Sequence, residues 1–141
     1  MTQLSVHRPL VIIGAGSHGR VVAALAQRAG HWIKGFLDRS AEPMVEGFPI
    51  IGGDEYLDAM PARDIQIAMG LGSHASWQRR LELCKYVDGL GLSAPQLIDP
   101  GAACASSVEI GSGTQVLMGA RVQVGASIGK WCIVNTAAVI E

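Results

Sequence analysis

The stretch that decides the fold is 98-IDPGAA CASSVE IGSGTQ VLMGAR VQVGAS IGKWCI VNTAAV-139, written here in groups of six residues. Every group begins with an apolar residue, and the series continues at Ile140. Four positions after each leading residue comes a small or β-branched one: Ala102, Val108, Thr114, Ala120, Ala126, Cys132 and Ala138. A period of six matches neither the two-residue period of an ordinary strand nor the 3.6-residue period of a helix.

The six-residue period predicts a β-helix. Each group would form one short flat strand and a corner, with its leading residue on the axis of the coil and its small residue at the turn. One group cannot bury its own apolar side, so the coil is stabilised by stacking of successive turns. We therefore expect residues 96–141 to form a β-helix domain that ends before its last coil is complete.

Residues 1–95 differ from this repeat because their apolar runs alternate with helical spacing. We predict strands at Leu10–Ile13, Trp32–Leu37, Ile65–Leu71 and Pro95–Ile98, and helices at Val21–Ala29, Asp54–Met60 (with Asp54 as N-cap) and His74–Val87. On the last helix, Trp77, Leu81 and Cys84 are expected to face the core, and Arg79 and Arg80 the solvent. Alternating strands and helices predict an α/β fold, a Rossmann-like parallel sheet covered by helices.

A glycine-rich loop, Gly14-Ala15-Gly16-Ser17-His18-Gly19, fits the pattern GxGxxG between a predicted strand and a predicted helix. Gly14 would allow the tight turn, Gly16 the approach of a phosphate, and Gly19 the close packing of helix on strand. The amino end of the helix attracts a diphosphate. Asp38, at the end of the second strand, is placed to accept hydrogen bonds from ribose hydroxyls. The loop alone leaves open a dinucleotide, a nucleotide-sugar, coenzyme A, or a turn that only packs the fold.

Other candidate residues surround this loop. Gly70 and Gly72 follow the strand at residues 65–71, at the sheet edge where such folds bind ligands. The predicted substrate-binding set is Gly14, Gly16, Ser17, His18, Gly19, Asp38, Arg39, Gly70, Gly72 and His74. His7 and His31 are assigned no role.

Composition narrows the classes of function. The 141 residues are 49% hydrophobic and 16% charged, which excludes a disordered chain. A net charge of −1 provides no basic surplus for nucleic acid. No apolar run approaches the length of a membrane span or a signal sequence, so we expect a cytoplasmic protein that binds neither membrane nor nucleic acid. The three cysteines form no metal-binding pattern and are expected to be small buried side chains.

Taken together, the two parts resemble the sugar O- and N-acyltransferases of the sialic acid O-acetyltransferase type. This group includes N-acetyltransferases that act on nucleotide-linked 4-amino-sugars. The resemblance rests on GAGSHG at 14–19, FLD at 36–38, FPIIGG at 48–53 and NTAAVIE at 135–141. It implies a nucleotide-sugar-binding N-terminal domain and a left-handed β-helix. It also implies homotrimers that bind acetyl-CoA, the acyl donor, between neighbouring β-helices.

The activity that the resemblance implies is transfer of acetyl from acetyl-CoA to an amino or hydroxyl group of a nucleotide-linked sugar or sialic acid. In the family, the general base is a histidine just after the segment that matches 135–141, whereas this chain ends at Glu141. We therefore expect an inactive, truncated chain. Asn135 is the candidate catalytic residue, for orienting the substrate or the base, although it can instead bond neighbouring backbone. The alternatives are an NAD-dependent oxidoreductase and a non-catalytic nucleotide-sugar-binding module.

Overall fold

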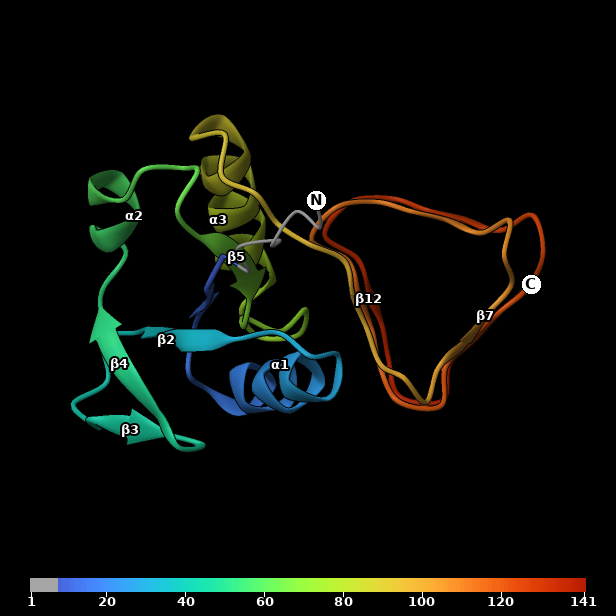
Figure 1. Ribbon diagram of the computed structural model, residues 1–141, viewed down its shortest axis with the longest axis horizontal. Coiled ribbons are helices and arrows are strands. Elements are labelled where there is room, and N and C mark those ends of the chain that lie inside the picture. The colour runs from blue at the N-terminus through green and yellow to red at the C-terminus, as the bar shows by residue number, and fades with distance from the viewer. Residues whose placement is uncertain (1–7) are drawn as a thin grey trace, which may run out of the picture.

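The computed structural model describes residues 8–141, so the expectation for His7 lies outside the described residues. An α/β unit lies beside a triangular coil, which Figure 1 shows nearly end-on. The fold class predicted from the sequence, a parallel sheet with helices followed by a β-helix, is confirmed.

The N-terminal sheet has five strands, in the order β3-β4-β2-β1-β5. They are β1 (Leu10–Ile13), β2 (Ile33–Leu37), β3 (Met44–Val45), β4 (Phe48–Gly52) and β5 (Gln66–Met69). Strands β1, β2, β4 and β5 are parallel, and β3 pairs with β4 in the antiparallel sense. The β3–β4 pair was not predicted, because β3 has only two residues and β4 contains a proline, Pro49, which is unusual within a strand.

In the described part of the chain, three helices cover this sheet: α1 (Ser17–Arg28), α2 (Tyr56–Ala59) and α3 (Trp77–Gly89). Alternate residues of β1 face opposite layers, so that Leu10 and Ile12 pack in one core with α1, and Val11 and Ile13 pack in another core with α3. All four side chains are almost fully buried, as expected of a strand covered on both faces.

Three predicted helix starts were wrong. Helix α1 begins at Ser17, four residues before the predicted Val21. Helix α2 is shorter than predicted, and its side chains supply no cap, because Asp54 instead forms an ion pair with Arg79. Helix α3 begins at Trp77, which leaves His74 in the preceding turn.

The buried face of α3 also differs from the prediction. Its buried residues are Arg80, Leu83, Cys84 and Val87, whereas Trp77 and Leu81 are about half exposed. The face is rotated because the Arg80 guanidinium donates to the carbonyl oxygens of Leu71 and Trp131, which a pattern based on hydrophobicity cannot anticipate.

The coil consists of two-residue strands on three faces, each of which is a parallel sheet. One face is β6-β9-β12 (Leu97–Ile98, Gln115–Val116, Ile133–Val134), the second is β7-β10-β13 (Ala103–Cys104, Arg121–Val122, Val139–Ile140), and the third is β8-β11 (Glu109–Ile110, Ser127–Ile128). Partners along a face, such as Leu97 and Gln115, are 18 residues apart, which is three groups of six per coil. The predicted strand Pro95–Ile98 therefore exists as β6, but it belongs to the coil, where it pairs with β9.

The α/β unit and the coil meet at a seam of polar contacts. Arg28 of α1 forms two hydrogen bonds with the buried Asp99 carboxylate, at 2.8 and 3.0 Å. Gln115 and Arg80 also bridge the two parts. This seam holds the first turn of α1 and the end of β5 against the coil, and so positions the site described below.

Candidate functional site

The glycine-rich loop turns sharply between β1 and α1. Gly14 has φ +95°, a conformation that other residues rarely adopt. A Cβ on Gly19 would lie 2.0 Å from the carbonyl oxygen of Gly14, and a Cβ on Gly70 would lie 2.3 Å from the same oxygen. The loops after β1 and β5 therefore pack backbone against backbone, and only glycine fits at Gly19 and Gly70.

Gly16 has a different reason to be glycine. Its φ of −72° is ordinary, and a Cβ built there meets no atom within 4 Å. No side chain caps α1, and no acidic residue lies in its first turn. The amino end of α1 thus faces open space, which a ligand anion can occupy.

A pocket of about 340 Å³ opens at this loop. Eight of the ten predicted substrate-binding residues line it: Gly14, Gly16, Ser17, His18, Asp38, Arg39, Gly70 and Gly72. The other two do not, because Gly19 is buried beneath the loop and His74 is exposed outside the pocket. The structure brings these eight together, and their binding role stays a prediction.

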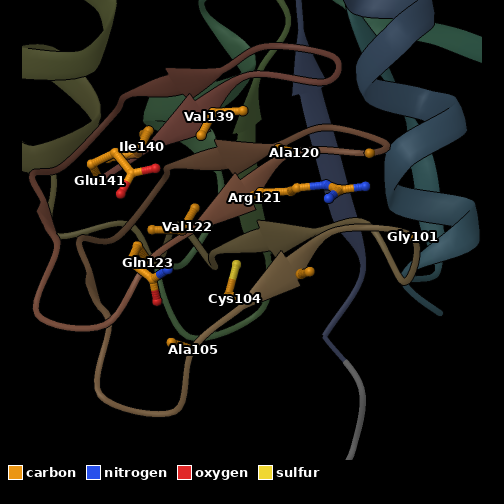
Figure 2. A pocket seen from close by; sticks show the side chains of 12 residues that line it. Gly101, Cys104, Ala105, Ala120, Arg121, Val122, Gln123, Val139, Ile140 and Glu141 are labelled. Carbon is orange, nitrogen blue, oxygen red and sulfur yellow. The ribbon is translucent and has the colours of Figure 1, made fainter.

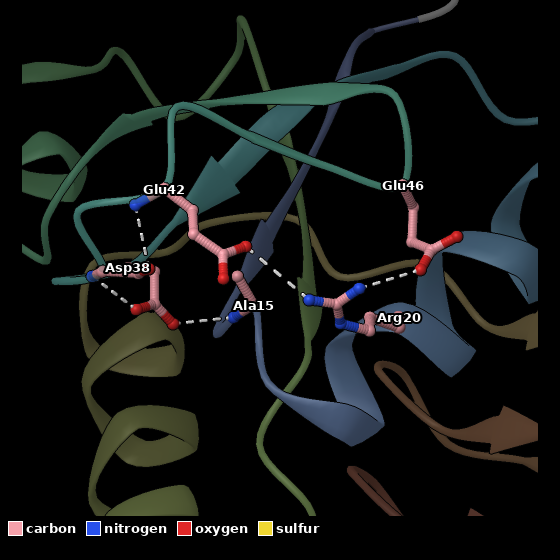
Figure 3. A network of polar contacts seen from close by, with 6 residues as sticks. Ala15, Arg20, Asp38, Glu42 and Glu46 are labelled. Atoms are coloured by element: carbon pink, nitrogen blue, oxygen red, sulfur yellow. Dashed lines mark hydrogen bonds and ion pairs between the residues drawn. The ribbon is translucent and has the colours of Figure 1, made fainter.

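Asp38 holds the loop in place. Its Oδ2 accepts a hydrogen bond from the Ala15 N–H (Figure 3), at 2.7 Å. Its Oδ1 accepts one from the Ser40 N–H at 2.8 Å. The carboxylate thus ties the end of β2 to the glycine-rich loop. This is a structural role that the sequence analysis did not anticipate, while the expected contact with ribose stays a prediction.

An exposed ion-pair network flanks the same region. Arg20 of α1 lies between Glu42 and Glu46, at 3.7 and 3.1 Å, as Figure 3 shows. These two glutamates belong to the segment from β2 to β4. Because all three side chains are about half exposed, the network contributes little to stability.

His18 connects the pocket to the coil. Its Nε2 lies 2.8 Å from the Oε1 of Gln115, which is fully buried. Burial lowers the pKa of His18, and the positive charge of Arg80 adds to this effect, whereas the hydrogen bond to Gln115 opposes it. The neutral imidazole is therefore favoured in the folded protein.

Arg80 is a buried, charged residue next to Leu71, which lines the pocket. It donates hydrogen bonds to the carbonyl oxygens of Leu71, at 2.5 Å, and Trp131, at 2.7 Å. The prediction of a solvated Arg80 was wrong. The predicted surface residue Arg79 is exposed, but it lines the pocket beside Asp54, its ion-pair partner. Neither Gln115 nor Arg80 carries a sequence signal, because their contacts join the α/β unit to the coil across 46 to 97 residues of sequence.

The predicted catalytic residue, Asn135, is exposed at the corner after β12, and its Oδ1 accepts a hydrogen bond from the Thr136 N–H at 2.8 Å. This contact corresponds to the alternative of a bond to neighbouring backbone, and a catalytic role stays a prediction.

Among the cysteines, Cys84 is buried, and burial raises the pKa of its thiol to about 11. Cys104 and Cys132 are only half-buried.

A second hollow, of about 710 Å³, lies along the β7-β10-β13 face of the coil. Figure 2 shows Cys104, Val122 and Ile140 stacked in register there. Its charged lining residues are Arg121 and Glu141, and its other side chains are mostly small or apolar. We place the candidate site at the smaller glycine-loop pocket, where charged groups, a histidine and a helix terminus converge.

Comparison with protein families identifies the PglD N-terminal domain over residues 9–85, more than half of the chain. The chain belongs to the PglD N-terminal domain family. A search of curated proteins gave no significant match. Within residues 8–141, no helix is long and apolar enough to cross a membrane.

Solved structures of two acetyltransferases are similar to the whole chain. The acetyltransferase domain of PglB from Neisseria gonorrhoeae FA1090, in complex with acetyl coenzyme A, is 36% identical with a TM-score of 0.87, and the match covers 95% of this chain and 64% of that one. Perosamine N-acetyltransferase from Caulobacter crescentus, as a histidine-to-asparagine mutant with CoA and GDP-perosamine, is 28% identical with a TM-score of 0.84, covering 94% and 62%. The predicted resemblance is confirmed, and the chain spans less than two-thirds of either structure.

Proposed function

We propose that the glycine-loop pocket binds a nucleotide-linked sugar, as part of a protein that transfers acetyl from acetyl-CoA to a sugar amine. The observation that carries the proposal is the pocket itself. The amino end of α1 faces open space at Gly16, and polar side chains of Ser17, His18, Asp38 and Arg39 surround it. Perosamine N-acetyltransferase, similar over nearly the whole chain, was solved with CoA and GDP-perosamine.

The parts of the ligand would have different partners in this pocket. Backbone N–H groups at the start of α1 suit the diphosphate, since they carry partial positive charge and no side chain caps them. Arg39 and Arg79, which also line the pocket, offer additional positive charge. The two Asp38 oxygens retain further lone pairs with which to accept from ribose hydroxyls.

In this proposal, residues 1–95 hold the nucleotide-sugar and residues 96–141 belong to the β-helix that places the acyl donor. In the reaction, the sugar amine attacks the thioester carbonyl while a general base takes a proton from the amine. The amide C–N bond forms as the C–S bond breaks, and CoA leaves as a thiolate that takes up the proton. Homotrimers with acetyl-CoA between neighbouring β-helices are part of the same proposal, as the family resemblance implies.

A thermal-shift comparison tests the nucleotide-sugar assignment against the oxidoreductase alternative. A ligand stabilises the state that binds it, so UDP- or GDP-linked sugars should raise the melting temperature in a concentration-dependent way, and NAD should not. Stabilisation by NAD alone would overturn the proposal. Substitution of the pocket residue Arg39→Ala should reduce the shift, whereas Arg63→Ala, at an exposed arginine outside the pocket, should not.

A further inference from the structure

Gln115 is fully buried although it is polar, and it bridges three segments that are far apart in the chain. It lies on β9 of the coil. Its Nε2 donates to the carbonyl oxygen of Met69, at the end of β5, at 2.7 Å. Its Oε1 lies 2.8 Å from the Nε2 of His18, in the first turn of α1. A single amide therefore reaches from the coil to the lining of the candidate pocket.

The chemistry of these partners determines where the proton lies. The carbonyl oxygen of Met69 can only accept, so the NH₂ group of Gln115 must face it. The amide oxygen consequently faces His18, and this oxygen can only accept. His18 must therefore donate from Nε2. In the neutral imidazole, Nδ1 is then left with a lone pair.

We propose that Gln115 is a positioning residue that holds His18 in its Nε2-protonated form, so that Nδ1 accepts a hydrogen bond from a donor group of the nucleotide-sugar. The donor would be a hydroxyl, an amine or a base N–H. This inference rests on the proposed function. The inference also assigns His18 to a part of the ligand other than the diphosphate. The ring donates its one proton to Gln115, so it presents a lone pair to the ligand instead of a positive charge.

The first test needs no ligand, so its result is independent of the proposed function. Long-range ¹H–¹⁵N spectra of the chain with ¹⁵N-labelled histidine should show His18 protonated at Nε2 and not at Nδ1 near pH 7.5. In Gln115→Met, which keeps the length of the side chain but removes the acceptor, the two neutral forms should become mixed. An Nδ1-protonated ring in the unsubstituted chain, or an unchanged ring in Gln115→Met, would overturn the inference.

Thr114→Val is the matched control for buried polarity in the coil. Thr114 is also fully buried, and its hydroxyl donates to the Gly129 carbonyl oxygen at 2.7 Å and accepts from the Cys132 N–H at 3.0 Å. This variant should lose stability without altering the His18 spectrum. If Gln115→Met does not fold, Gln115→Glu replaces it, and the added negative charge should raise the pKa of His18. An unchanged pKa in that variant would count against the contact.

The second test measures how affinity for a UDP- or GDP-linked sugar depends on pH, by titration calorimetry from pH 8 to pH 5. If Nδ1 accepts from the ligand, protonation of His18 removes the acceptor, and affinity should fall roughly three- to tenfold as the pH is lowered. If His18 contacts phosphate, protonation adds positive charge and affinity should rise, which would contradict the inference.

The other charged groups near the ligand also affect such a profile. Arg80 lies close to His18, and Asp38, Arg39, Asp54 and Arg79 line the pocket. The variant His18→Gln keeps all of them, so any pH dependence that it retains belongs to those groups and is subtracted. If neither sugar nucleotide binds, the proposed function fails, while the spectra still decide the role of Gln115.

Discussion

The α/β unit and the coil bury their side chains in different ways. In the α/β unit, β1 is covered on both faces, so that four consecutive residues are buried. In the coil, the core is one narrow column of leading residues such as Val116, Val122 and Val134. The β6-β9-β12 face is covered by the α/β unit, whereas the outward side chains of the other two faces are exposed. The sharp backbone turns of the α/β unit create a polar pocket, whereas the hollow on the coil is lined mostly by small or apolar side chains. The difference teaches that the site lies where regular structure is interrupted.

The seam between the two parts differs from both interiors. Within residues 8–141, four buried side chains are polar or charged, and three of them, Arg80, Asp99 and Gln115, lie at the seam. The Arg28 guanidinium lowers the pKa of the Asp99 carboxyl through its hydrogen bonds and its charge. Polar partners with defined geometry fix the orientation of the coil relative to the pocket, which apolar contact alone would specify less closely.

The largest expected effect comes from breaking the seam at Arg80. In Arg80→Met, the carbonyl oxygens of Leu71 and Trp131 lose their hydrogen bonds, which should lower the free energy of unfolding by about 2 to 4 kcal/mol. Its neighbour Arg79 is the control, because its ion pairs are exposed and Arg79→Met should cost less than about 1 kcal/mol. Urea denaturation measures both, and equal losses would show that the seam is not held by Arg80.

An intermediate effect is expected at Gly16, where the pocket is open, in contrast to the tightly packed glycines of the same loop. Gly16→Ala introduces a methyl group that meets no protein atom, so the folded state should tolerate it. The methyl group would occupy the space of the diphosphate, and affinity for a UDP- or GDP-linked sugar should fall about tenfold, or roughly 1.4 kcal/mol.

Gly89→Ala, at the end of α3, provides the matched control. A Cβ there also meets nothing within 4 Å, and Gly89 does not line the pocket. Calorimetry should find its affinity unchanged. Equal affinities for both variants would mean that no ligand approaches Gly16.

The smallest expected effect is the pH dependence of stability from His18. Because burial in the folded state lowers the pKa of His18 below its ordinary value of 6.5, the unfolded chain takes up the proton first as the pH falls. This contribution to stability is present above pH 6.5 and is lost as the pH falls through 6.5 toward the lower folded pKa. Urea denaturation from pH 8 to pH 5 should show a smaller loss in His18→Gln than in the unsubstituted chain. Parallel profiles would place His18 in a solvated environment.

Strong periodicity predicted much of the fold. The six-residue repeat gave the coil, because each leading residue occupies the same place on the axis whatever its neighbours are. The first strand and the turn after it were predicted from the apolar run Leu10–Ile13 and the glycines that follow. The two-residue strand β3, the proline-containing strand β4 and the start of α3 near His74 were not predicted, since tertiary contacts determine them.

The sequence indicated which residues lie around the candidate site but not the hydrogen bonds between them. Eight of the ten residues predicted from the sequence line one pocket, and their binding role stays a prediction. The sequence pattern gave no sign of how these residues contact one another. It did not indicate that Asp38 binds the Ala15 N–H, because a carboxylate at this position suits ribose equally well. The contact between His18 and Gln115 spans 97 positions of sequence, and no local pattern encodes it.

Titration of the ¹⁵N-labelled chain with a UDP- or GDP-linked sugar, followed through its amide spectra, tests the central proposal most directly. We predict saturable shifts centred on Gly14, Gly16 and Gly70, with smaller changes at Gln115 across the seam. Shifts confined to the β7-β10-β13 face, or no saturable shift with either sugar nucleotide, would contradict the assignment of the pocket.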